Sequence, residues 1–201
     1  MSRSDRQAQP STCRAQQDTL GRARYRVRQF FDALRAAVTP IDEAYVRAHL
    51  SRTQHPKALW QLFQTMPKAE QHHGIHTCQS LEERGFTDPD LMAAALLHDV
   101  GKSVAPPLLW ERVFVVLVER FLPQLAARWR GQGPMSNALK GVRRGFLVRH
   151  YHPVWGAEMV AETGASDRIV SLIRHHHVDG HCRHGGISDA ELMALHEADE
   201  N

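Results

Sequence analysis

The chain has 201 residues, 42% of them hydrophobic, and a formal net charge of +3, which is enough apolar material for one substantial core with an appended arm. No stretch approaches the ~20 apolar residues of a membrane span, and the first residues lack the apolar run of a secretory signal, so we expect a cytoplasmic protein without a transmembrane segment. The three cysteines, Cys13, Cys78 and Cys182, lack CxxC spacing, which argues against a disulfide framework and fits a reducing compartment.

The N-terminal part divides into two expected regions. Residues 1–20 are polar and basic, and we expect them to be disordered. Residues 21–66 are expected to form a helical segment packed on the core. The arginines from Arg22 to Arg28 could touch nucleic acid, but without interleaved aromatic residues this partner is not expected. The predicted helices of this region run from about Tyr25 to Val38, from Asp42 to Leu50 and around Lys57–Met66.

The rest of the chain is also predicted to be helical, without the alternating pattern of strands. A helix from Lys68 to Arg84 ends at Gly85, and Asp88 caps the next helix, in which Pro89 is the first residue. Residues 107–130 read as apolar-faced helices broken near Pro123, followed by a loop at 131–134. The remaining predicted helices are Arg143–Tyr151, His152–Thr163, Ser166–His177 and Ser188–Asp199, the last with a capping box of Ser188 and Glu191. We therefore expect an all-α fold.

The segment LMAAALLHDVGK places His98 and Asp99 at the end of an apolar helix. Buried polar groups need partners, and an acid in the last turn of a helix opposes the helix dipole. A divalent cation would satisfy both residues, because it binds imidazole nitrogen and carboxylate oxygen together. The alternative is a solvated aspartate beside a core histidine whose hydrogen bonds are satisfied.

Two later helices also carry a polar residue on a line of core-facing positions. His176 follows Ile173 by three residues, and Asp199 follows Leu195 by four, so each lies on the apolar face of its helix. A carboxylate on a core-facing line is unfavourable unless a positive group meets it. We therefore expect these helices and the one that ends at His98 to share a cation.

Other histidines are candidates for the same site. Pro153 can start a helix, which would leave His152 at the N-cap with its ring facing a cleft; the alternative is a loop-exposed histidine. In the run His72-His-Gly-Ile-His76, the middle histidine, His73, lies closest to the apolar face, and His76 is the reserve choice.

The ordered set of an upstream histidine, the His98-Asp99 pair with Gly101 and Lys102, and a distant Asp199 resembles the HD-domain superfamily of metal-dependent phosphohydrolases, of the HDIG type. The resemblance covers roughly residues 65–201 and makes residues 67–201 an HD-type metal-binding helical domain. The segments around His152 and before His176 look like the extra histidines of its two-metal branches, which include cyclic-dinucleotide phosphodiesterases and diadenosine tetraphosphate hydrolases.

The resemblance implies a compact all-α HD-domain bundle with an N-terminal helical arm. It implies a phosphohydrolase that uses a metal-activated water on a nucleotide or other small phosphoester. The metal would be Mn, Fe, Ni or Zn, as one ion or two. Asp99 and Lys102 would be catalytic, with Lys102 near the substrate phosphate; a homo-oligomer stays open. The implied metal ligands are His73, His98, Asp99 and Asp199 for the first ion, and His152 with His176 or His175 for a second, with Asp99 bridging.

Some features depart from the family pattern. A Gly-Tyr-Pro motif is absent after Gly180, and Val100–Ser103 replaces the acidic pair of guanosine tetraphosphate hydrolases. Cyclic di-GMP and guanosine tetraphosphate are therefore not expected as substrates. The nine Lys and Arg against two Glu in residues 102–150 suit an anionic ligand, and they equally suit solvated helix faces.

Two other functions remain open. One is a catalytically degenerate HD-like sensor or protein-interaction module that uses the apolar face of Val113–Leu122. The other is a structural zinc site in the tract from His175 to His184.

Overall fold

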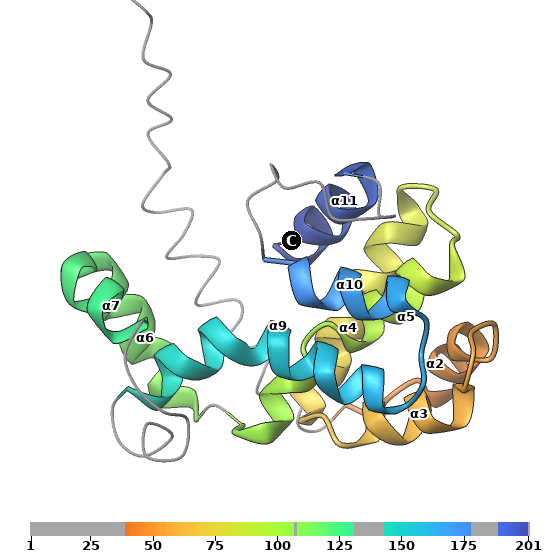
Figure 1. Ribbon diagram of the computed structural model, residues 1–201, viewed down its shortest axis with the longest axis horizontal. Coiled ribbons are helices and arrows are strands. Elements are labelled where there is room, and N and C mark those ends of the chain that lie inside the picture. The colour runs from red at the N-terminus through yellow and green to blue at the C-terminus, as the bar shows by residue number, and fades with distance from the viewer. Residues whose placement is uncertain (1–38, 107, 131–142, 178–188, 201) are drawn as a thin grey trace, which may run out of the picture. The chain divides into compact units, whose positions relative to one another are not determined.

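The computed structural model describes residues 39–106, 108–130, 143–177 and 189–200. Within these ranges every regular element is a helix and there is no strand, so the predicted all-α fold class is confirmed (Figure 1). The elements are α2 Glu43–Leu50, α3 Pro56–Gln64, α4 Lys68–Glu83, α5 Pro89–Leu97, the 3₁₀ helix η1 Val100–Val104, α6 Leu109–Phe121, α7 Pro123–Arg130, α9 Arg144–Glu162, α10 Asp167–His175 and α11 Asp189–Asp199.

Several predictions fall outside the described residues. These are the disordered segment 1–20, the helix Tyr25–Val38, the arginines of 22–28, the loop 131–134, the capping residue Ser188 and most of the histidine tract that ends at His184. Among the described helices, none is both long and apolar enough to cross a bilayer.

Local sequence signals set the start of α5, the start of α10 and the end of α4, where helix ends were predicted. The Asp88 carboxylate accepts hydrogen bonds from the backbone N–H groups of Asp90 and Leu91 at 3.1 and 3.0 Å, which caps α5. The Ser166 hydroxyl caps α10 by accepting from Ile169 N. Gly85, after α4, has φ +86°, a left-handed conformation that favours glycine at the end of a helix.

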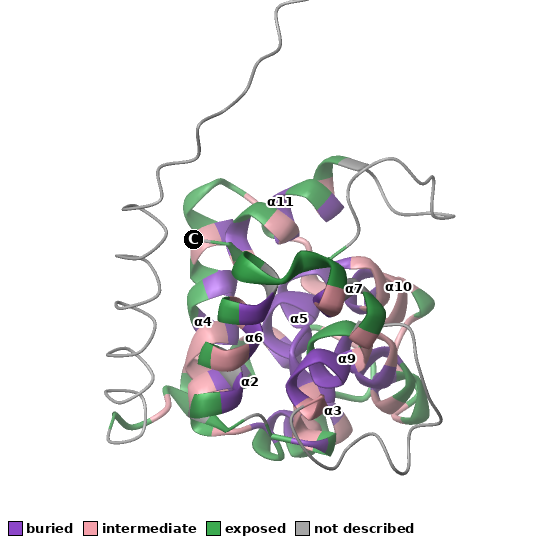
Figure 2. Ribbon diagram, turned by 90° about the vertical axis from the view of Figure 1, so that its left-hand side faces the viewer, coloured by how far each residue is buried: buried purple, intermediate pink, exposed green. Residues whose placement is uncertain are grey.

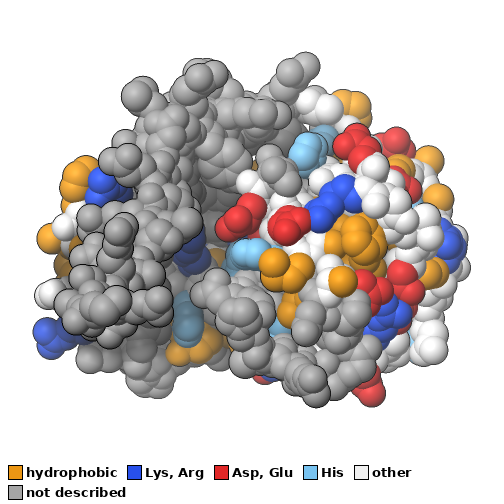
Figure 3. All heavy atoms as spheres, turned by 90° about the horizontal axis from the view of Figure 1, so that it is seen from above, with side chains coloured by type: hydrophobic (Ala, Val, Ile, Leu, Met, Phe, Trp, Pro, Cys, Tyr) orange, Lys and Arg blue, Asp and Glu red, His pale blue; other side chains and the backbone are white. Residues whose placement is uncertain are grey.

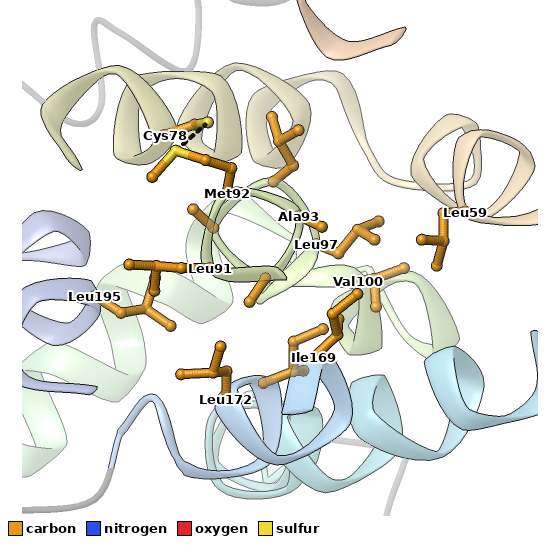
Figure 4. Close-up of a cluster of buried hydrophobic side chains, with 14 of the residues drawn as sticks. Leu59, Cys78, Leu91, Met92, Ala93, Leu97, Val100, Ile169, Leu172 and Leu195 are labelled. Carbon is orange, nitrogen blue, oxygen red and sulfur yellow. Dashed lines mark hydrogen bonds between the residues drawn. The ribbon is translucent and has the colours of Figure 1, made fainter. Parts of the chain in front are cut away.

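Helix α5 lies at the centre of the main core. Each of its residues from Leu91 to Leu97 is fully buried. Figure 4 looks along this helix and shows side chains of α3, α4, α10 and α11 around it, among them Leu59, Cys78, Leu172 and Leu195. Burial of one leucine side chain contributes about 1.5–3 kcal/mol, so α5 is a firm support for the two polar residues that follow it.

Helix α9 corrects the sequence analysis. The predictions of separate helices at Arg143–Tyr151 and His152–Thr163, and of an N-cap role for His152, were wrong, because one helix runs through with Pro153 inside it. Proline has no N–H to donate to the carbonyl four residues back, which is that of Arg149. Nδ1 of His152 lies 3.0 Å from this carbonyl oxygen and 3.0 Å from that of Val148. The histidine thus replaces the lost donor, and the helix continues.

A second, smaller core joins α6, α7 and the first part of α9. It consists of Val115, Val118, Ala126 and Phe146, with Phe114 and Trp129 packed against it. The break between α6 and α7 comes at Leu122, immediately before Pro123, as predicted.

Candidate metal centre

Six side chains that the sequence singled out converge from different elements. Figure 3 shows histidine and acidic side chains next to one another on one face. The described residues contain three overlapping groups whose nitrogen and carboxylate atoms lie within 4.8 Å of one another. Six of their seven members were predicted: His73 in α4, His98 after α5, Asp99 before η1, His152 in α9, His176 after α10 and Asp199 at the end of α11.

The first group surrounds Oδ1 of Asp199. Nε2 of His73 lies 2.6 Å from this oxygen, and Nε2 of His98 lies 3.1 Å from it. Oδ2 of Asp99 lies 3.5 Å from Nε2 of His98 and 4.0 Å from Nε2 of His73. Neighbouring ligand atoms of one transition-metal ion, each about 2.1 Å from the metal, are about 3 Å apart. His73, His98 and Asp199 therefore have the spacing that one cation requires, and Asp99 lies next to them.

The second group lies on the other side of Asp99. Oδ1 of Asp99 is 3.2 Å from Nε2 of His152. The His152 ring lies 5.3 Å from the His176 ring and 5.0 Å from the His177 ring, centroid to centroid. The two oxygens of the Asp99 carboxylate thus face different groups of side chains.

His177 is a member of the group that the sequence analysis missed. Its side chain is 42% exposed, and its Nδ1 lies 3.9 Å from Oδ2 of Asp199. It lies two residues beyond the end of α10, next to the predicted ligand His176. The two reserve candidates are elsewhere: His76 is exposed, and Nδ1 of His175 is bonded to the Ser171 carbonyl at 2.8 Å.

Three buried histidines are oriented by their own helices. Nδ1 of His98 lies 2.8 Å from the Ala95 carbonyl oxygen, Nδ1 of His176 lies 2.7 Å from that of Ile173, and His152 makes the contacts described above. A carbonyl oxygen only accepts, so Nδ1 carries the proton in each ring. The lone pair of a neutral ring is therefore on Nε2, which faces the site in all three cases. Metal-binding histidines are commonly fixed in this way.

The chemistry of His176 tests whether a metal fits. The side chain is fully buried, and Nε2 has no hydrogen-bond partner among the described residues. Burial, together with the neighbouring His177 and His98, holds the pKa of His176 well below its usual range, so the ring is neutral at pH 7. An unsatisfied buried polar atom costs about 1–3 kcal/mol, and coordination to a metal uses its lone pair. The donor set therefore fits a metal ion.

The two carboxylates of the site are charged, in contrast to the neutral ring of His176. Although burial raises the pKa of Asp99, Lys102 and His98 lower it well below its usual range. Burial also raises the pKa of Asp199, and His98 and His73 lower it overall. Burial lowers the pKa of His98, but Asp99 and Asp199 raise it well above its usual range. Both acids are ionised, and the centre of the site needs positive charge.

Lys102 reaches the site from η1. Its Nζ lies 2.5 Å from Oδ2 of Asp99 and 3.1 Å from Oε2 of Glu70. Glu70 is buried and belongs to α4, one turn before His73. Glu70 was not among the predicted site residues. Its spacing of three residues from His73 puts the two on the same face of the helix and is the signal that could have found it.

Comparison with known proteins adds one positive finding. The family model described as HD domain matches residues 52–200, which is well over half of the chain. No curated protein and no solved structure gives a significant match.

Proposed function

The chain belongs to the HD-domain family, typically metal-dependent phosphohydrolases that bind divalent metals, and on this premise we propose that it hydrolyses a nucleotide or another small phosphorylated molecule. The observation that supports this most is the position of Asp99, a buried carboxylate whose two oxygens face two groups of histidines.

We assign the metal ligands from the two groups. His73, His98, Asp99 and Asp199 would hold one ion; His152, His176 and His177, with Asp99 between the groups, would hold another. Neutral imidazole and carboxylate donors suit Mn²⁺, Fe²⁺, Ni²⁺ or Zn²⁺. When bound, such an ion lowers the pKa of a coordinated water to about 7 and offsets the negative charge of a phosphate.

Lys102 is the residue that we assign to the substrate. Its ammonium shares Asp99 with the proposed metal, and the bond to Glu70 keeps it beside the site. Burial lowers the pKa of Lys102, but Asp99 and Glu70 raise it overall, so the side chain stays charged and can bind a phosphate oxygen. Of the proposed ligands, His73 and His177 are the more exposed, and they mark the side from which a substrate can approach.

The test combines metal content with activity. We expect the purified protein to contain a stoichiometric transition metal and to hydrolyse at least one member of a panel of nucleotides and phosphoesters. Asp99→Asn, which keeps the size of the side chain, should lose both properties. Asp167→Asn, which changes an exposed acid in the first turn of α10, is the matched control and should lose neither.

The outcomes separate the alternatives. Metal without turnover of any compound would favour a catalytically degenerate module. Metal content that is the same in Asp99→Asn as in the wild type would point to a site elsewhere, such as the histidine tract that ends at His184. A protein that neither contains nor takes up metal would contradict the proposal.

A further inference from the structure

Helix α6 carries an apolar stripe that the proposed phosphohydrolase site does not use. The side chains of Trp110, Val113 and Leu117 are 51%, 51% and 48% exposed, and that of Phe121 is 71% exposed. Their spacing of three or four residues puts them on one face of the helix. We define the apolar stripe as these four residues with Leu108 and Leu122 at its two ends.

The opposite face of α6 holds the stripe in place. Val115 and Val118 are buried in the second core against α7 and α9. The start of the helix is fixed by Glu111, a buried acid that accepts a hydrogen bond from Leu108 N at 2.7 Å and pairs with Arg144. Figure 2 shows exposed positions along α6 and α7. The stripe therefore belongs to a packed helix and is not a frayed end.

The stripe is also unusual for this chain. Of the eight large hydrophobic side chains that are exposed in the described part of the chain, six lie between Leu108 and Leu122. Single exposed hydrophobic residues are ordinary, whereas a contiguous row marks a surface that contacts something.

Charge identifies the kind of partner. Arg120 and Arg128 are exposed on α6 and α7, and the Arg120 guanidinium lies 5.9 Å from the centroid of the Phe121 ring. The segment 102–150 contains nine Lys and Arg and two Glu. Arg144 pairs with Glu111, and Lys102 pairs with Asp99 and Glu70; with these pairs set aside, seven Lys and Arg and one Glu remain. A second copy of the same face would bring these arginines together, which is unfavourable. Charge therefore favours an anionic partner.

We propose that the apolar stripe docks on the surface of an anionic lipid bilayer. Tryptophan, phenylalanine and leucine on one face of a helix, with arginines beside them, insert into the boundary between headgroups and acyl chains while the arginines bind lipid phosphates. The thirteen residues of α6 span about 20 Å at 1.5 Å per residue, so the helix would lie in the plane of the surface. The stripe lies along a single helix and can therefore lie against a flat bilayer surface. An acidic protein segment would instead need a groove to bind in.

The first experiment is co-sedimentation of the full chain with vesicles. We expect binding to vesicles of phosphatidylcholine with phosphatidylglycerol, weaker binding when salt is added, and little binding to phosphatidylcholine alone. The affinity of the variant Leu117→Ser/Phe121→Ser for these vesicles should fall by about tenfold or more, because the inserted apolar area is lost. Met193→Ser changes a hydrophobic residue that is 42% exposed elsewhere, and it should bind like the wild type.

Three results would overturn the proposal. One is no binding of the wild type to either vesicle. Another is equal binding of the double variant, which would assign the contact to another part of the chain. The third is a dimer, seen by light scattering without vesicles, that the double variant abolishes. Circular dichroism of each variant checks the fold.

A second measurement locates the contact. Brominated acyl chains quench tryptophans that enter the bilayer, and we expect most of the quenching to be lost in Trp110→Phe. Quenching that is unchanged in this variant would contradict the proposal, whatever the protein's metal content or activity.

Discussion

The backbone of Gly101 lies directly against that of His152: a Cβ atom added to Gly101 would be 2.0 Å from the His152 carbonyl oxygen. Helix α9 can therefore approach η1 only because residue 101 has no side chain. This approach brings Nε2 of His152 to 3.2 Å from Asp99.

Gly101→Ala should push α9 away from η1 and lower the metal content. We expect a loss of about 3 kcal/mol in the free energy of unfolding, since the clash is with backbone atoms, and less metal in the folded fraction. Urea denaturation and elemental analysis measure the two effects. Gly85→Ala is the control: it should cost about 1–2 kcal/mol through its left-handed backbone and leave metal content unchanged. Full metal content in Gly101→Ala would contradict this prediction.

His176→Leu should separate stability from metal binding. Leucine removes the buried Nε2 that has no hydrogen-bond partner among the described residues, so the metal-free protein should gain about 1 kcal/mol in the free energy of unfolding. The same variant should bind one metal ion fewer. His175→Leu, its neighbour outside the ligand groups, should keep the wild-type stoichiometry. Titration calorimetry and urea denaturation check both expectations, and equal metal binding by both variants would count against the assignment of His176.

The metal-free protein should lose stability as the pH falls from about 6.5 towards 4. Partial burial and the nearby His152 lower the pKa of His177 to about 4, and burial lowers that of His176 further. The unfolded chain therefore binds protons at these residues in a range where the folded chain does not, which favours unfolding. His98, whose pKa is raised, acts in the opposite direction, but its contribution is already complete below its unfolded value of about 6.5.

Urea denaturation at several pH values measures this dependence. His176→Leu/His177→Gln should flatten the curve between about pH 4 and 6.5, while His55→Gln, an exposed histidine, should not. A flat curve for the wild-type metal-free protein would show that this account is wrong.

The pair formed by Lys102 and Glu70 should appear in a double-mutant cycle. Lys102→Met removes the cation 3.1 Å from the buried Glu70 carboxylate and should cost about 3 kcal/mol of stability. Adding Glu70→Gln should recover part of that loss, because it removes the charge left behind. Lys102→Met should also raise KM for a phosphorylated substrate by a larger factor than the factor by which it lowers metal content. Additive losses in the cycle would mean that the two residues do not interact.

The sequence predicted the all-α fold class and several helix ends, because these depend on local rules, whereas the six candidate ligands came from helical spacing together with the resemblance to a family. Asp88 and Ser166 cap helices through their own neighbours, and the inward direction of His176 and Asp199 follows from helical spacing. The predictions that were wrong concern features that depend on the three-dimensional structure. The continuity of α9 through Pro153 depends on a side chain that takes over a backbone bond.

Two further residues show the same limit. His177 lies just past the end of α10, and its approach to Asp199 depends on how α10 and α11 pack together. The spacing of Glu70 from His73 places it on the same face of α4, but its link to the site is the ammonium of Lys102, thirty-two positions away along the chain. Neither relationship can be predicted from the spacing of apolar residues.

The bonds from Nδ1 of His98, His152 and His176 to carbonyls of their own helices mean that no other side chain is needed to aim these rings. Substitutions of other residues around the site can therefore alter substrate preference without turning these three rings. The orientation of each Nε2 depends on the backbone of its own helix. Imidazoles held by a neutral amide oxygen also donate less electron density than those held by a carboxylate, which leaves a bound ion a stronger Lewis acid.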